Sequence, residues 1–388
     1  MKQSINIGAR KRGEETRAHR VVSRSRSFGL AAMVILVLTI AVGCSSSSVR
    51  FAYIATGQGI YAFRMNSRTG AGALVFGSPF VTKIAPTTAA APSSVVVHPS
   101  NRFLYAANQN TNTISLFTIN STTGALTEVL PPTALVTASG GVGLSPAVMT
   151  MDSAGSFLFV GNQVTNDIWV FSIGSSGALT FVSSAQVGAS PTGLTLTASG
   201  GFLYVPVPTF PAIYVFSVSS GTLTQVGSSG QGSAPFIVNG VGQLGVDPGG
   251  HFLYVPNPSL NTVTVLKIQS DGTLAAGPGL FATGTTPVAA ATNATGAFLY
   301  VANSGSTDLS QFQVDTTTGA LTALTTSIAG TGTNPESILI DPDAKFVFVI
   351  NEQSDSVTEF TINTNGTLAT TGNALQLSVV PRSLSVTR

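Results

Sequence analysis

Apolar residues along this chain fall in short runs that return at a regular interval. Seven six-residue runs begin with Phe and carry Tyr or Phe two positions later, as in FLYAAN from Phe103 and FLYVAN from Phe298. Successive runs start 45 to 54 residues apart. Short apolar runs of this composition, bounded by Gly, Pro and Asn, predict β-strands, and their recurrence predicts an array of equivalent units. The aromatic positions are Tyr53, Tyr105, Phe159, Tyr204, Tyr254, Tyr300 and Phe348.

Two further markers keep the same register. One is a Gly followed shortly by Leu, as in TGALT, at Gly72, Gly124, Gly177, Gly221, Gly272, Gly319 and Gly366. The other is a Pro that opens an apolar stretch, at Pro92, Pro146, Pro191, Pro287, Pro335 and Pro381. The fifth repeat lacks this Pro, and we place its equivalent near Gly240 and Val241.

Each unit is predicted to form four short antiparallel strands, in the second repeat at residues 94–98, 103–107, 113–119 and 125–129. These strands are nearly all apolar. A sheet with one wet face alternates apolar and polar residues, so this pattern indicates sheets buried on both faces. The sequence therefore predicts an all-β fold, a seven-bladed β-propeller with four antiparallel strands in each blade.

The two ends of the repeat array are complementary. The first repeat begins directly with its second strand at Phe51, and the chain finishes with an unpaired first strand, Pro381 to Val386. Together they complete one blade, which closes the ring and removes exposed strand edges. We expect one propeller domain over residues 50–388, and a monomer, because a closed ring needs no partner.

The first 43 residues have a different character. A basic stretch to Arg26 precedes an apolar run from Phe28 to Val42 of 15 residues, shorter than the roughly 20 that span a bilayer. This order is typical of a secretory signal. Its end, Ala41-Val42-Gly43-Cys44, resembles the lipobox of bacterial lipoproteins, in which the cysteine is acylated.

That resemblance implies a lipoprotein signal peptide over residues 1–43, lipidation at Cys44 and a Ser-rich tether over 44–49. A plain signal peptide or a short uncleaved anchor remains the alternative. The expected location is the extracytoplasmic cell envelope with a lipid anchor in the membrane. Ser45 stands where Asp favours retention at the inner membrane, so the outer membrane is preferred.

Charge and cysteine usage exclude several function classes. The chain's net charge is +2, and residues 1–43 hold eight Lys or Arg against two Glu, so the remainder carries −4. That acidic remainder lacks the basic footprint of a nucleic-acid partner. With one Cys and three His, the chain predicts no disulfide, no Cys/His metal site and no cofactor.

The units FLYVAN from Phe298, FLYVPN from Phe252 and TGALT from Thr123 resemble the seven-bladed lactonase family, which includes 6-phosphogluconolactonases, and the related YVTN-type propellers. The resemblance covers about residues 50–388. It implies that lactone-processing members place His, Arg and Glu in the funnel, often with His beside the Pro that opens the first strand. In this chain the residues after those prolines are Ser93, Ala147, Thr192, Val288, Glu336 and Arg382, and none is His.

Two charged residues stand out on the face where propellers usually bind ligands. Glu336 and Arg382 hold equivalent positions in neighbouring blades. In a catalytic interpretation, Glu336 activates water as a general base and Arg382 stabilises the oxyanion of an opening lactone. Alternatively, the two form a salt bridge at the ring seam. Further candidate ligand-binding residues are Asp308, Glu352, Asp355 and Lys83.

The remaining polar candidates can also be explained by structural roles in turns. A recurrent Asn after the second strand either forms a polar ring for a ligand or stabilises the following turn. These residues are Asn108, Asn162, Asn257, Asn303 and Asn351. His98 and His251 are predicted to lie in turns on the opposite face.

Two functions follow. One is a non-catalytic envelope propeller that binds a carbohydrate, lactone or protein ligand on its loop face. The other is an extracytoplasmic lactone hydrolase that uses Glu336 and Arg382. A phosphorylated lactone is disfavoured because only Arg382 and Lys83 offer positive charge nearby. The two functions differ in whether Glu336 and Arg382 meet in an open pocket or in a sealed ion pair.

Overall fold

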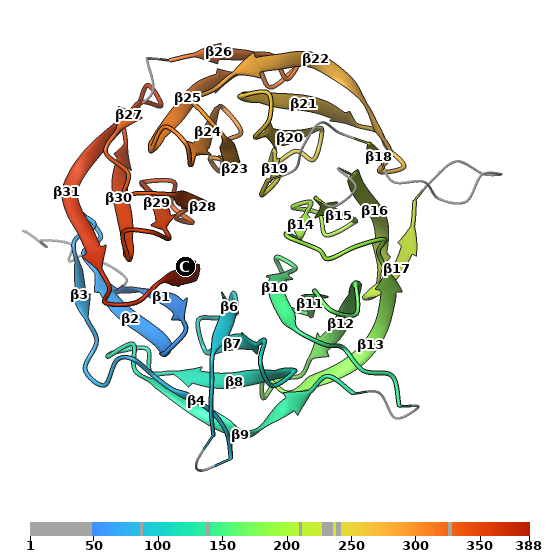
Figure 1. The fold of residues 1–388 in the computed structure, drawn as a ribbon, viewed down its shortest axis with the longest axis vertical. Coiled ribbons are helices and arrows are strands. Elements are labelled where there is room, and N and C mark those ends of the chain that lie inside the picture. The colour runs from blue at the N-terminus through green and yellow to red at the C-terminus, as the bar shows by residue number, and fades with distance from the viewer. Residues whose placement is uncertain are drawn as a thin grey trace, which may run out of the picture. The chain divides into compact units, whose positions relative to one another are not determined.

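Seven antiparallel sheets stand around one axis, as the repeats predict (Figure 1). The computed structural model describes residues 49–85, 88–136, 140–208, 212–226, 236–237, 242–324 and 328–388. The predictions for residues 1–43, for Cys44, for the Ser-rich tether up to Ser48 and for Gly240 and Val241 lie outside the described residues. Within the described part of the chain, no helix is long and apolar enough to cross a membrane.

Blades 2 to 7 follow one another along the chain, each with its first strand at the axis (Figure 1). Blade 2 consists of β6 (Pro92–Val97), β7 (Phe103–Asn108), β8 (Thr113–Ile119) and β9 (Leu126–Ala134). Blade 3 consists of β10 (Pro146–Met151), β11 (Phe157–Asn162), β12 (Asp167–Ile173) and β13 (Leu179–Gln186). Blade 4 consists of β14 (Thr195–Leu196), β15 (Phe202–Val207), β16 (Ala212–Ser219) and β17 (Thr222–Gln225), and β18 (Phe236–Ile237) also pairs with β16.

The later blades repeat this order. Blade 5 consists of β19 (Gly245–Val246), β20 (Phe252–Asn257), β21 (Thr262–Ile268) and β22 (Leu274–Ala282). Blade 6 consists of β23 (Pro287–Thr292), β24 (Phe298–Asn303), β25 (Asp308–Val314) and β26 (Leu321–Ala323), with β27 (Ile328–Ala329) paired to β25. Blade 7 consists of β28 (Pro335–Ile340), β29 (Phe346–Asn351), β30 (Ser356–Ile362) and β31 (Leu368–Gln376).

Blade 1 joins the two ends of the chain, which confirms the predicted closure. Its strands are β1 (Arg50–Thr56), β2 (Gly59–Met65), β3 (Gly72–Leu74) and, at the axis, β32 (Pro381–Val386). Tyr53 pairs with Ser385 and Ala52 with Val386. A separate hairpin of β4 (Thr82–Ala85) and β5 (Thr88–Ala90) connects blade 1 to blade 2.

The hydrophobic core lies between blades. Seven clusters of buried side chains are present, and each joins the middle strands of two neighbouring sheets. The second strand β7, for example, is buried at all six positions. Burial on both faces accounts for the missing alternation in the sequence.

Hydrogen bonds link the two sequence markers across the blade interfaces. The Tyr105 hydroxyl donates to the carbonyl of Gly177 in the next blade at 2.8 Å. Tyr53, Tyr204 and Tyr300 make the same bond to Gly124, Gly272 and Gly366. These glycines have positive φ, and in blade 1 the residue with this geometry is Gly70 (φ 75°). The first repeat's marker is therefore Gly70, and our assignment of Gly72 is wrong by two residues, because Ala71 separates two glycines there.

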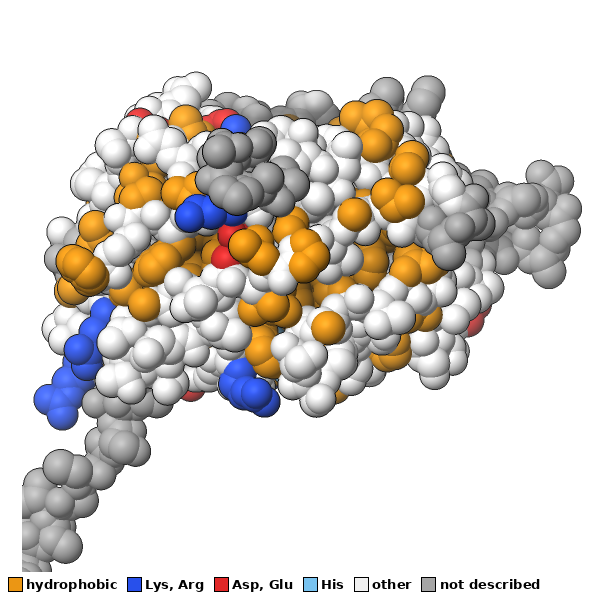
Figure 2. Space-filling model, turned by 90° about the horizontal axis from the view of Figure 1, so that it is seen from below, with side chains coloured by type: hydrophobic (Ala, Val, Ile, Leu, Met, Phe, Trp, Pro, Cys, Tyr) orange, Lys and Arg blue, Asp and Glu red, His pale blue; other side chains and the backbone are white. Residues whose placement is uncertain are grey.

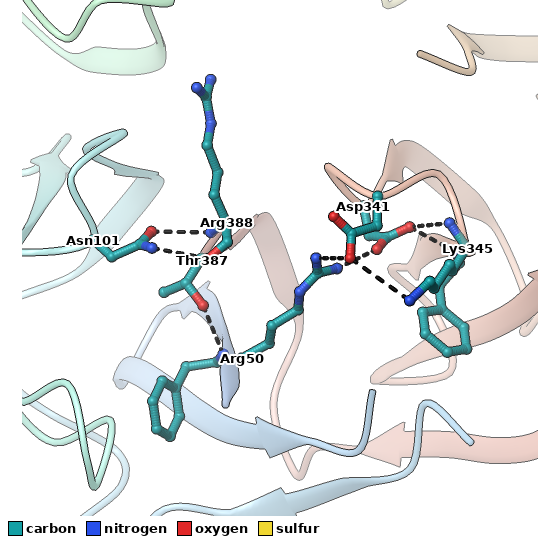
Figure 3. Close-up of polar contacts among 9 residues, drawn as sticks. Arg50, Asn101, Asp341, Lys345, Thr387 and Arg388 are labelled. Atoms are coloured by element: carbon teal, nitrogen blue, oxygen red, sulfur yellow. Dashed lines mark hydrogen bonds and ion pairs between the residues drawn. The ribbon is translucent and has the colours of Figure 1, made fainter. Parts of the chain in front are cut away.

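The seam between blades 7 and 1 is held by an ion-pair cluster (Figure 3). The Arg50 guanidinium contacts the carboxylates of Asp341 and Asp343, and the Arg50 and Asp341 side chains are 8% and 1% exposed. On the other side of blade 1, Asn101 of blade 2 both donates to and accepts from the Arg388 backbone at 2.9 Å. Blade 1 is thus bonded to blade 7 through Arg50 and to blade 2 through Arg388.

Candidate functional site: the central cavity

The residue after the first-strand proline occupies a β-bulge in five of the six blades that have this proline, blade 4 being the exception. Between β28 and β29 the pairing shifts from Pro335–Asn351 to Ser337–Ile350, which leaves Glu336 as the extra residue. Arg382 is the extra residue of β32 in the same way, between the pairs of Pro381 and Ser383. A bulge redirects the side chain of its extra residue. The same shift occurs at Ser93, Ala147 and Val288.

These bulge residues line one cavity at the centre of the ring, with a volume of about 640 Å³. Its lining includes Ser93, Ala147, Thr192, Val288, Glu336 and Arg382. The positions singled out in the sequence therefore converge on one space. Asp152 and Arg388 line the same cavity beyond the other ends of β10 and β32. Among the residues described, no histidine lines it.

Glu336 is the side chain of the cavity that is best suited to acid–base chemistry. Its side chain reaches solvent there, yet the surrounding blades desolvate it, and this burial raises the pKa of the Glu336 carboxyl above its usual range. The negative charge of Glu352 raises the pKa further. A carboxylate with a raised pKa is a better proton acceptor, which suits a general base.

Arg382 approaches the loop of its own blade. A guanidinium nitrogen lies 3.8 Å from the position that a Cβ on Gly57 would occupy. In the described structure neither an ion pair nor a hydrogen bond joins Arg382 to Glu336. The two side chains share an open cavity, and the ion pair that closes the seam is instead that of Arg50 with Asp341.

The other candidate ligand-binding residues lie outside the cavity lining. Glu352 is exposed and its carboxylate accepts a hydrogen bond from the Asn334 amide at 3.1 Å. The Asp308 carboxylate accepts bonds from Asn303 at 2.7 Å and from Ser306 at 2.9 Å, within one turn. Of these residues, only Glu352 acts on the cavity, through its charge.

The last two candidates are also placed away from the axis. The Asp355 backbone, at a φ of 46°, forms a turn and accepts a bond from the Leu377 N–H. Lys83 lies on β4, where its N–H donates to the Glu128 carboxylate of blade 2. That hairpin packs against the outer strand β9, so Lys83 is distant from the bulge residues around the axis (Figure 1).

The recurrent asparagines serve the turns. The Asn108 amide donates to the hydroxyls of Thr113 and Ser115, at 3.1 and 3.0 Å, in its own blade. Asn257 and Asn303 make equivalent bonds. All five residues are buried, so their amide groups position the second-to-third-strand turns and form no polar ring at the surface.

The two histidines of the propeller contact turn residues and solvent. The His98 ring contacts the Ser100 hydroxyl at 2.7 Å and the Gly155 carbonyl at 3.0 Å. The His251 side chain is 68% exposed beside Asp247. Neither lines the cavity.

Gln243 is a cavity residue that the sequence analysis missed. Its backbone bonds to Val288 and Ala290 of blade 6, and its side-chain oxygen accepts a bond from Ser337 of blade 7 at 2.8 Å. Gly245 pairs with Tyr254 as Leu339 pairs with Phe348, so Gln243 corresponds to Ser337, two residues after the first-strand proline of blade 7. The only available sequence signal was the polar side chain itself, two residues before a short apolar stretch.

Comparison with solved structures supports this architecture. A Bacteroides fragilis protein assigned as a 6-phosphogluconolactonase superposes with a TM-score of 0.73 at 21% identity, over 89% of this chain and 99% of that one. The periplasmic gluconolactonase of Pseudomonas aeruginosa gives 0.70 at 19% identity, over 88% and 99%. At such identities the likeness is one of fold alone. No curated protein matches the chain in sequence.

The fold is that of a seven-bladed β-propeller with a cavity at its centre. The sequence model of the family "Lactonase, 7-bladed beta-propeller" matches residues 77–139, 133–240 and 237–334. The chain belongs to this family.

Proposed function

We propose that the protein is an extracytoplasmic lactone hydrolase, attached to the cell envelope through its N-terminal segment. The observation that carries the proposal is that Glu336 and Arg382 occupy neighbouring bulges and share an open cavity without forming an ion pair. A sealed pair would have no free carboxylate or guanidinium for a substrate. The periplasmic gluconolactonase of similar fold supports the location.

The chemistry requires a base, a water molecule and a cation. Glu336 takes a proton from water while the oxygen attacks the lactone carbonyl, and Arg382 stabilises the negative oxygen that forms. The ring C–O bond then breaks, and protonated Glu336 returns its proton to the departing alkoxide. The product is the open hydroxy acid, and the carboxylate is regenerated.

The substrate that fits is a neutral sugar lactone. The charged side chains lining the cavity are Glu336, Arg382, Asp152 and Arg388, so the net charge of the lining is zero. A phosphate ester needs several cations or a helix N-terminus. We therefore expect the unphosphorylated lactone to be preferred.

The test is hydrolysis of glucono-δ-lactone and of its 6-phosphate, compared with the spontaneous rate. Replacing Glu336 by Gln is expected to lower kcat roughly 10²–10⁴-fold, the range of a general base. Replacing Arg382 by Gln is expected to lower kcat about 10²-fold, as for loss of an oxyanion donor. Lys267→Gln is the matched control, because Lys267 is exposed on β21 away from the cavity. Full activity in Glu336→Gln would contradict this site.

A second candidate is a non-catalytic binding module. The absence of histidine from the described cavity lining favours it, since the carboxylates of Glu336 and Asp152 would be the only candidate bases. It predicts saturable binding of a carbohydrate in the cavity without turnover. Calorimetric binding of the gluconate product, lost in Arg382→Gln and with no hydrolysis of any lactone tested, would favour this function.

A further inference from the structure

The outer edge of blade 1 presents apolar side chains to solvent. Its outer strand β3 has only three residues. The chain then leaves the sheet, although Val75 and Phe80 still bond to β2. Leu74 is 55% exposed and Phe76 is 98% exposed, the highest value among the exposed large apolar side chains of the described chain. A phenylalanine side chain that stays in water lacks about 1.5–3 kcal/mol of favourable burial free energy. A fully exposed phenylalanine beside other apolar residues therefore indicates a surface that another molecule covers.

The apolar surface continues onto blade 2. Val81 of the connecting segment and Val129 and Leu130 of β9 are 38%, 39% and 58% exposed. Hairpin strand β4 packs on β9, which makes this one continuous wall of the ring. Figure 2 views the molecule from the side of β4 and β9 and shows hydrophobic side chains spread over this face, with few charged ones among them.

Charge is distributed unevenly around the ring. Blades 1 and 2, residues 49–134 and 381–388, hold seven Lys or Arg and one Glu, a net charge of +6. The remaining blades, residues 135–380, hold two Lys and 12 Asp or Glu, a net charge of −10. Arg64 and Arg68 are exposed on blade 1, and neither forms an ion pair within the described structure. The apolar wall therefore lies in the positive part of the molecule.

The N-terminal segment joins the propeller at the same blade. Arg50 pairs with Met65, and Met65 with Gly72, so β3 lies two strand spacings, about 10 Å, from the start of β1. The apolar run that ends at Val42 is seven residues before Val49. Seven residues reach at most about 25 Å. A membrane that holds this segment is within reach of blade 1.

We propose that the apolar wall of blades 1 and 2, with Leu74 and Phe76 at its blade 1 edge and with Arg64 and Arg68 exposed on the same blade, is the membrane-facing surface of the propeller and rests on an anionic phospholipid bilayer. Phe76 and Leu74 enter the headgroup boundary, and the two arginines contact lipid phosphates. The inference rests on the membrane attachment in the proposed function, but it is independent of lactone hydrolysis. Contact through the wall leaves both ends of the central cavity open.

The test uses the full chain reconstituted in vesicles of phosphatidylcholine and phosphatidylglycerol with brominated acyl chains, which quench nearby tryptophan. Phe76→Trp reports the proposed surface, and Leu280→Trp is the matched control, 57% exposed on β22 across the ring. The native Trp169 is 2% exposed and supplies the baseline. We expect quenching at position 76 to be at least about twofold stronger than at position 280.

The arginines are tested in the Phe76→Trp background. Replacing Arg64 or Arg68 by Gln is expected to lower the equilibrium constant for contact between the wall and anionic vesicles about fivefold each. In vesicles of phosphatidylcholine alone, neither replacement is expected to have an effect. Equal quenching at positions 76 and 280 would overturn the surface while membrane attachment stands. A chain that fails to associate with vesicles would overturn both, and the lactonase assay would still decide the proposed function.

Discussion

The Glu359 carboxylate lies against Gly70 across the seam between blades 7 and 1, so close that a Cβ on Gly70 would fall 1.2 Å from its Oε1. At the other six interfaces the equivalent glycine packs against the phenylalanine that begins the preceding blade's second strand. Glu359 is 1% exposed, and neither carboxylate oxygen has a hydrogen-bond partner in the described structure. The atoms nearest to this glycine are thus those of a buried acid at the seam and those of an aromatic ring at the other interfaces.

This acid makes stability depend on pH. Burial, together with a smaller contribution from the charge of Asp341, raises the pKa of Glu359 from an ordinary value of 4.5 to about 8. The folded protein therefore binds a proton more tightly than the unfolded chain. Its contribution is fully present below about pH 4.5 and is lost as pH rises to about 8. We expect the free energy of unfolding, measured in urea between pH 5 and pH 9, to fall with rising pH.

Glu359→Gln is expected to remove that dependence and to stabilise the protein above about pH 8 by several kcal/mol, since each tenfold proton preference is worth about 1.4 kcal/mol. Blade 6 shows that the amide fits, because Gln311 holds the equivalent position and accepts a bond from the Leu368 N–H at 2.7 Å. An unchanged slope of stability against pH in the variant would show that another group is responsible.

The tyrosine hydroxyls at the blade interfaces are expected to differ in their contribution to the free energy of unfolding. Tyr105→Phe removes a 2.8 Å bond and leaves the Gly177 carbonyl buried, a loss of about 1–2 kcal/mol. Tyr254→Phe is the matched control, because the Tyr254 hydroxyl has no partner in the described structure. Chemical denaturation of both variants checks this. Equal losses would mean that ring packing, and not the hydrogen bond, sets the contribution.

The ion pairs of Arg50 are expected to contribute strongly to the stability of the seam between blades 7 and 1. Arg50→Met leaves the Asp341 carboxylate, 1% exposed, without its cation, and such a change costs about 3–5 kcal/mol. Arg64→Met is the control, since Arg64 lies on the next strand of the same blade and is exposed. Destabilisation of similar size in both would argue against the seam pair. Thermal unfolding followed by circular dichroism gives the comparison.

The charge of Glu352 is expected to set the pH profile of hydrolysis. Glu336 must be deprotonated to act as a base, so activity rises with pH through its pKa. Because Glu352 raises that pKa, Glu352→Gln moves the acidic limb of kcat/KM to lower pH. An unmoved limb with normal kcat would exclude Glu336 as the titrating base.

Local sequence determines most of this architecture. Each repeat carries its own strands and turns, so the blades, their number and the closure by Pro381 to Val386 follow from periodicity. The cavity position of Glu336 and Arg382 also follows, because the residue after a first-strand proline lines the central cavity in each such blade.

Exceptions to the repeat are harder to predict. Glu359 faces Gly70 only because two blades meet at a particular rotation, and no local pattern records that angle. Gln243 reaches blade 7 from a repeat without the proline marker. Lys83 shares a segment with the ligand-type loops but belongs to an added hairpin on β9, which carries it to the outer wall.

The pairing of β1 with β32 also has a consequence for biosynthesis. Phe51 and Thr387 are hydrogen-bonded across 336 positions of sequence. During synthesis, β1 emerges early and keeps an unpaired edge until the last strand has been made. Contacts this distant in sequence form late. Any chain that ends prematurely, or is clipped before Pro381, lacks the strand that completes blade 1, so its open edge would expose it to the proteases that degrade incompletely folded proteins.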